Sequence, residues 1–272
     1  MPISLDEAVD LTRMGDVWIF RGRSPADRAI QAMTNSPVNH VGMAVVIDDL
    51  PPLMWHAELG RSLPDMWTGS HQRGAQLHDL REAVLVWGTR YGQRAWLRQL
   101  DGPATPDMED AVLGTIARLD GTPFPSTARL ASRWARGRVP IRRPQRPDGT
   151  LETAYCAEVV ALTYQAMGLL PRDRRPNWYD PGRFWCGDDL DLSAGARLGG
   201  EITVRIPPKP GRPAGRPATS GDGRPARVRG RRAPEMRASG VQDHLRPAFV
   251  PGVEVPVALR RLIQRKFMRH HE

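Results

Sequence analysis

The sequence predicts an α+β domain followed by a basic C-terminal tail. Residues 1–206 alternate short β-rich runs with helices that have an apolar face, which is typical of one mixed domain around a single core. Residues 207–272 hold 15 Lys and Arg against 5 Asp and Glu, whereas residues 1–206 hold 24 against 25. The formal net charge of +9 is therefore a property of the tail, and it says little about what the domain binds.

The first part of the domain predicts two capped helices and three strands. Ser4 and Glu7 fit a capping box, and Ser24 with Pro25 fits the start of a second helix. Runs rich in β-branched and aromatic residues predict buried strands, two of them joined as a hairpin. The expected elements are a helix that ends near Met14, a strand at 17–20, a helix that ends near Thr34, and hairpin strands at 40–47 and 53–57.

The rest of the domain is less regular until the last helix. Residues 58–104 are mixed and turn-rich and predict no secure element. A helix is expected at 106–119, a Pro- and Arg-rich surface loop at 136–150, and a strand at 201–206. The clearest helix spans 155–167, because apolar residues recur there at helical spacing and a glycine follows.

Cys156 lies in the first turn of that helix. The helix dipole lowers the pKa of a thiol at this position, and free backbone N–H groups there can stabilise an oxyanion. A lone cysteine on an apolar helix is, however, more often a structural residue. His40 opens the first hairpin strand, and His56 and Glu58 share one face of the second, so Cys156, His40 and one of the other two form a candidate catalytic set.

Three short motifs occur in a distinctive order. They are GDVWIF at 15–20, NHVGM at 39–43 and YCAEVV at 155–160. In this order they resemble the circularly permuted papain-like proteins, the YiiX-like relatives of NlpC-type cell-wall peptidases, with lecithin retinol acyltransferase-like proteins as cousins. The resemblance covers roughly residues 12–205.

The resemblance implies a permuted papain-like fold in which an antiparallel sheet or half-barrel packs against the cysteine-bearing helix. It implies that Cys156 is the nucleophile and His40 the general base. The third polar residue would be His56, with Glu58 as the alternative. The implied activity is that of a thiol hydrolase or acyltransferase, which acts on an amide or ester bond of a peptide or lipid acyl substrate through a covalent thioester.

Three further residues are candidates for substrate binding. Trp55 adjoins His56, while Tyr155 and Glu158 flank the cysteine in its motif. A buried tryptophan is more often part of a core, and a glutamate in a first helical turn is often a cap or a salt-bridge partner. Cys186 lies in a loop-like stretch without a helix dipole, so it is a weaker candidate than Cys156.

The sequence predicts no cofactor and no metal site. The two cysteines show no metal-ligand spacing, and the acidic stretch at 188–191 lacks the glycine and distal glutamate of a calcium loop. No apolar run is long enough for a membrane span, and residues 1–7 do not resemble a secretory signal, so a cytoplasmic location is expected.

The role of the tail is open between two alternatives. Residues 207–272 are rich in Pro and Gly and are expected to be disordered. The domain could be a catalytically silent scaffold whose tail binds nucleic acid or anionic lipid by charge, in a salt-dependent way. The tail could equally be only a solubilising extension, and the oligomeric state is open.

Overall fold

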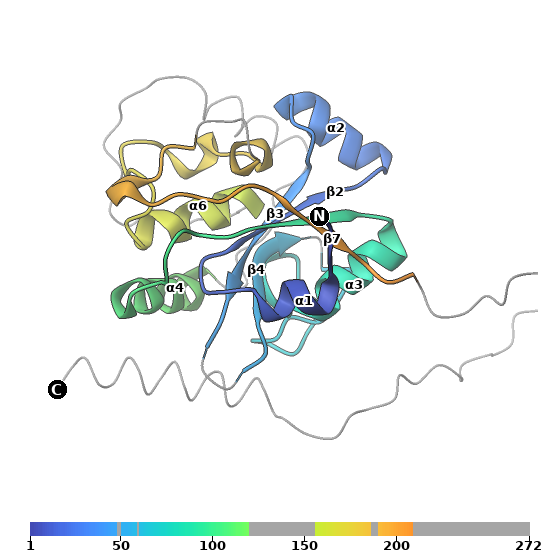
Figure 1. Ribbon diagram of the computed structural model, residues 1–272, viewed down its shortest axis with the longest axis horizontal. Coiled ribbons are helices and arrows are strands. Elements are labelled where there is room, and N and C mark those ends of the chain that lie inside the picture. The colour runs from blue at the N-terminus through green and yellow to red at the C-terminus, as the bar shows by residue number, and fades with distance from the viewer. Residues whose placement is uncertain (48–49, 59, 120–155, 186–189, 209–272) are drawn as a thin grey trace, which may run out of the picture. The chain divides into compact units, whose positions relative to one another are not determined.

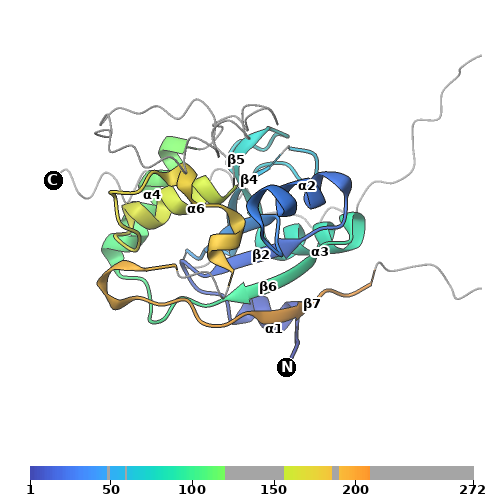
Figure 2. The ribbon, with the colours of Figure 1, turned by 90° about the horizontal axis from the view of Figure 1, so that it is seen from above.

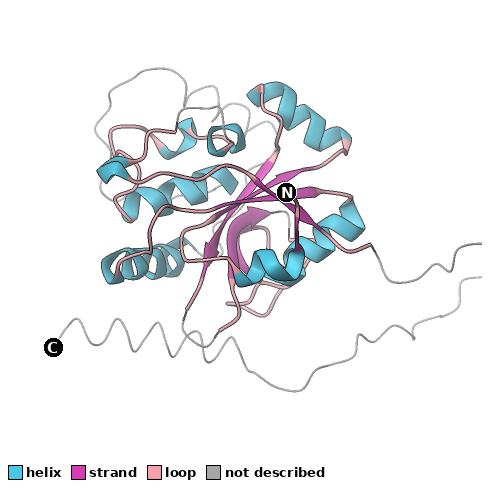
Figure 3. Cartoon of the chain, in the orientation of Figure 1, coloured by secondary structure: helices cyan, strands magenta, loops and turns pink. Residues whose placement is uncertain are grey.

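A seven-stranded mixed sheet with helices on both faces forms the described part of the chain (Figures 1 and 3). The computed structural model describes residues 1–47, 50–58, 60–119, 156–185 and 190–208. The strands are β1 (Ile3–Ser4), β2 (Val17–Arg21), β3 (His40–Val45), β4 (Leu53–Glu58), β5 (Gly74–Asp79), β6 (Arg94–Arg98) and β7 (Ile202–Arg205). The helices are α1 (Leu5–Asp10), α2 (Pro25–Thr34), α3 (Leu80–Tyr91), α4 (Pro106–Leu119) and α6 (Cys156–Ala166), with short 3-10 helices at Pro176–Trp178, Pro181–Phe184 and Ser193–Gly195.

The α+β class is confirmed, but the sheet is open and mixed rather than antiparallel. Its strand order is β1-β7-β6-β2-β3-β4-β5. Five of the six neighbouring pairs are antiparallel, and β1 runs parallel to β7 at one edge, where Ile3 pairs with Val204. The exception arises because the two ends of the domain meet at that edge, where β7 and α1 lie side by side (Figure 2).

Local capping signals gave the correct helix starts. Ser4 and Glu7 form the expected capping box, and so do Ser24 and Asp27 at the start of α2. The first helix ends at Asp10, one turn earlier than its predicted end near Met14. Helix α2 ends at Thr34 as predicted.

The predicted hairpin and the last strand are present as β3, β4 and β7, and the helix predicted at 106–119 is α4. The stretch 58–104, for which no element was predicted, contains β5, α3 and β6. Helix α6 is followed by Gly168 in the left-handed region, with a φ of 76°, as its predicted stop requires. The predicted loop at 136–150 and the tail at 209–272 lie outside the described residues.

The pleat of the sheet separates two apolar clusters. One cluster packs alternate residues such as Val41, Met43 and Trp55 against α4 and α6. The other packs Ala44 and Met54 from the opposite face against α1 and α3. The side chains of His40, His56 and Glu58 point to the same face as Ala44 and Met54, because even numbers of residues separate them along their strands. In the part of the chain that the structure describes, no helix combines the length and the apolar character needed to cross a membrane.

Gly42 leaves little room for a side chain where β3 pairs with β4. A Cβ at this position would meet Met54 Sδ well inside contact distance and would stand 3.3 Å from His56 Cβ. Gly42→Ala is therefore expected to lower the free energy of unfolding by about 1–3 kcal/mol through overpacking. Urea denaturation of both proteins measures the change. Gly200→Ala is the control, because a Cβ there meets nothing within 4 Å, and an equal loss in both variants would contradict the prediction.

Candidate functional site

Three histidines form a hydrogen-bonded chain on the α3 face of the sheet. His40 Nε2 lies 3.2 Å from His56 Nδ1, and His56 Nε2 lies 3.0 Å from His78 Nδ1. The residues come from the neighbouring strands β3, β4 and β5, so the sheet register itself sets their spacing. Because each imidazole offers one donor and one acceptor when neutral, a single direction of donation can run through all three rings.

Trp87 of α3 covers this histidine chain. Its ring packs nearly edge-on against His40 and His56, with centroid distances of 5.1 Å and 4.8 Å. The side chains of His56 and His78 have no exposed surface, and Trp87 retains only 3% of its own. The rings of His56 and His78 are therefore held away from water between the sheet and a helix, and His40 is partly buried beside them.

Burial keeps the histidines in their neutral form. It lowers the pKa of His40 to about 3 and that of His78 to about 4. The pKa of His56 is also well below its ordinary value, because the ring is buried and because its two histidine neighbours disfavour a second positive charge. At neutral pH the three rings are uncharged and can act as hydrogen-bond acceptors or metal ligands.

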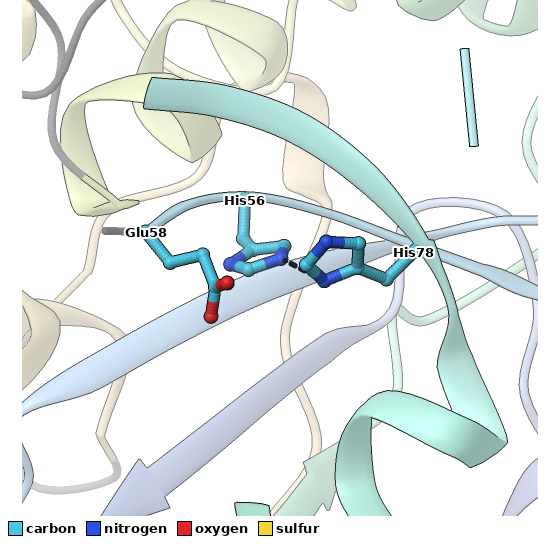
Figure 4. Close-up of side chains that lie close together, drawn as sticks. All are labelled: His56, Glu58 and His78. Carbon is cyan, nitrogen blue, oxygen red and sulfur yellow. Dashed lines mark hydrogen bonds between the residues drawn. The ribbon is translucent and has the colours of Figure 1, made fainter. Parts of the chain in front are cut away.

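Glu58 lies two residues beyond His56 on the same face of β4 (Figure 4). One carboxylate oxygen accepts a 2.6 Å hydrogen bond from Ser62 Oγ, and the Trp87 indole N–H also donates to the carboxylate. Burial raises the pKa of this carboxyl group, and these hydrogen bonds partly oppose the increase. One ligand atom each from His56, Glu58 and His78 lies within 4.8 Å of the other two.

Cys156 begins α6, on the opposite face of the sheet. Its sulfur accepts hydrogen bonds from the backbone N–H groups of Val41 and Ala157. Burial nevertheless raises the pKa of the thiol to about 11, and the Asp180 carboxylate adds a smaller contribution in the same direction. The expectation that the helix dipole lowers this pKa is wrong for the described state, because desolvation of the thiolate outweighs the N–H groups.

The structure does not bring Cys156 and His40 together as a hydrogen-bonded pair. Within the described residues, no hydrogen bond joins the sulfur to the His40 ring, which instead contacts His56 and Trp87. The reason is the pleat of β3: Val41 points toward α6 and the cysteine, whereas His40, one residue earlier, points toward α3. Of the predicted set, His40, His56 and Glu58 are gathered on one face and Cys156 is on the other.

The candidate substrate-binding residues are distributed as follows. Trp55 is fully buried, and its indole N–H donates a 3.0 Å hydrogen bond to Thr163 Oγ1 of α6. Glu158 is also buried, with 3% of its surface exposed. Tyr155 and Cys186 lie outside the described residues.

His78 and Trp87 were missed by the sequence analysis. They come from β5 and α3, within the stretch where no secure element was predicted. The alternation of Ala75 and Leu77 with Gln76 and His78 was the available signal for a strand, because Ala75 and Leu77 face one cluster and the polar pair faces the other.

Comparison with solved structures finds chains of similar fold, whereas comparison of sequences finds none. No protein-family model matches the chain, and no curated protein matches it. The crystal structure of the metalloprotein YiiX from Escherichia coli O157:H7 is similar, with 20% sequence identity and a TM-score of 0.38. The alignment covers 57% of this chain and 65% of the YiiX chain, so it spans less than two thirds of that structure. YiiX is also the protein type that the three sequence motifs resemble.

Proposed function

We propose that this protein is a papain-like thiol hydrolase or acyltransferase in which Cys156 is the nucleophile and His40 the general base. The substrate would be a peptide or lipid acyl group joined through an amide or ester bond. The observation that carries the proposal is the position of the Cys156 sulfur at the start of α6. There it accepts hydrogen bonds from the backbone N–H groups of Val41 and Ala157. Such N–H groups can stabilise a thiolate and, on a bound carbonyl, an oxyanion.

The proposed reaction needs a rearrangement of His40. This residue directly precedes Val41, whose N–H reaches the sulfur, so the backbone of His40 lies near the nucleophile although its side chain points away from it. Its side chain would have to leave His56 and turn toward α6. It would then take the thiol proton while the sulfur attacks the carbonyl carbon, and return that proton to the leaving amine or alcohol. Water or another acceptor would release the acyl group from the thioester.

Hydrolysis of an activated ester such as p-nitrophenyl butyrate tests the proposal. Cys156→Ala is expected to reduce the rate at least about 10³-fold and to abolish the acyl-protein adduct seen by intact mass spectrometry. His40→Ala is expected to reduce the rate without removing the thiol.

Cys186→Ala is the matched control, because it removes the second cysteine of the chain and should leave both the rate and the adduct unchanged. If Cys156→Ala turns over the ester as fast as the unchanged protein, the nucleophile is misassigned.

One observation favours a second candidate, a catalytically silent scaffold. The thiol is buried, its pKa is raised to about 11, and no imidazole of the described residues forms a hydrogen bond with it. In this proposal, residues 1–206 keep the fold while the basic tail at 207–272 binds nucleic acid or anionic lipid through its charge. A truncation that ends at Ile206 separates the two candidates: loss of salt-dependent polyanion binding with no ester hydrolysis in either form supports the scaffold.

A further inference from the structure

We propose that His56, Glu58 and His78 form a binding site for a divalent transition-metal ion, with Zn²⁺ as the best match. Ligand atoms of the three residues already lie within 4.8 Å of one another (Figure 4). They come from the neighbouring strands β4 and β5, in which His56 pairs with Gln76 and Met54 with His78. The sheet therefore places the three side chains before any ion binds.

The spacing of the two imidazoles suits a metal ion. His56 Nε2 and His78 Nδ1 face each other at 3.0 Å. Two nitrogen ligands at about 2.0–2.1 Å from a tetrahedral Zn²⁺ stand roughly 3.3 Å apart, so a small opening of the two rings would admit the ion. The ion would take the place of the hydrogen bond that now joins these nitrogens.

The donor set selects the class of metal. Two imidazoles with one carboxylate suit Zn²⁺ and related first-row ions, whereas Mg²⁺ and Ca²⁺ prefer sets made of oxygen. Burial keeps both rings neutral at physiological pH, which is the form that binds a metal. The His78 ring also donates a hydrogen bond to the Leu63 backbone, so it can keep its proton on one nitrogen while Nδ1 binds the ion.

The surroundings resemble the outer shell of a metal site. His40 Nε2 lies 3.2 Å from the remaining ring nitrogen of His56, and Ser62 Oγ donates to Glu58. Such partners fix the orientation and tautomer of ligand side chains. Trp87 packs on the imidazoles and excludes water, while Glu58 is partly exposed and offers the side from which an ion can enter.

Zinc titration of chelator-stripped protein, in competition with a chromophoric chelator, tests the site. The chain ends in His270-His271-Glu272, so the reference protein is the full chain with His270→Gln and His271→Gln. We expect the reference to bind one Zn²⁺ per chain and to gain thermal stability from it. In that background, His78→Gln and Glu58→Gln should each weaken zinc binding by about 100-fold or more, and His40→Gln by about 10-fold.

Glu82→Gln is the control, because this exposed carboxylate of α3 lies outside the ligand group. Glu58→Gln keeps the shape of the side chain, so it tests the site even where a buried histidine variant fails to fold; circular dichroism monitors folding. The proposal is overturned if the reference protein binds no zinc, or if folded Glu58→Gln binds it as tightly as Glu82→Gln.

Discussion

In chelator-treated protein, the free energy of unfolding is expected to fall as the pH is lowered from 6.5 toward 4. The pKa of His78 is lowered from its ordinary value of 6.5 to about 4 in the folded state, because the ring is buried. The pKa of His40 and that of His56 are lowered for the same reason. In this pH window the unfolded chain binds protons that the folded chain does not, so stability is complete above pH 6.5 and is lost on acidification.

His78 alone should account for roughly 3 kcal/mol of this loss, since a pKa change of one unit corresponds to about 1.4 kcal/mol. The three rings interact, so their contributions do not simply add. Urea denaturation at a series of pH values measures the profile. His78→Gln should flatten it, whereas His244→Gln, in the basic tail, should leave it nearly unchanged. A stability that stays constant between pH 6.5 and 4 would contradict the expectation.

Asp16→Ala is expected to lower the free energy of unfolding by about 3 kcal/mol. Asp16 is fully buried, and its carboxylate accepts 2.8 Å hydrogen bonds from the backbone N–H groups of Arg13 and Leu100. Alanine leaves both donors without an acceptor, and each loss of this kind costs about 1–3 kcal/mol. Thermal or urea unfolding at neutral pH measures the change.

Asp6→Ala provides the comparison for Asp16. The Asp6 carboxylate forms an exposed ion pair with Arg81 at 2.7 Å, and exposed pairs contribute about 0–1 kcal/mol. Asp16→Asn retains one oxygen that can accept, so its loss should fall between those of the two alanine variants. A loss for Asp16→Ala no larger than that for Asp6→Ala would show that the buried carboxylate does not hold the two segments together.

Helix starts and the central hairpin could be predicted because their signals are local. Ser4 and Ser24 cap their helices through the next three residues, and a hairpin needs only two neighbouring runs. The segment from β5 to β6 holds one such signal that was not recognised, because Asp79 caps α3 by accepting from the Glu82 N–H. Strand β5 places two polar side chains, Gln76 and His78, in the interior, and this obscures the apolar pattern from which strands are recognised.

For the candidate site, the sequence could predict only which side chains of one strand share a face of the sheet. That His56 and Glu58 point the same way follows from their two-residue spacing, and the structure bears this out (Figure 4). The residue pattern of β3 does not show which face of the sheet α6 covers. Val41 and His40 are neighbours in β3 and point to opposite faces, so Val41 lies beside the Cys156 sulfur and His40 beside Trp87. His78 joins the group through the pairing of β5 with β4, which is a tertiary contact.

The parallel pairing of β1 with β7 has a consequence for folding kinetics. Ile3 and Val204 are about 200 positions apart in the chain, so their pairing closes a very long loop. During synthesis, residues 3–4 must wait for nearly the whole domain before their strand partner exists. We therefore expect β1 to pair with β7 after the local hairpin of β3 and β4 has formed. The first strand of the domain depends on the last strand for its hydrogen-bond partners.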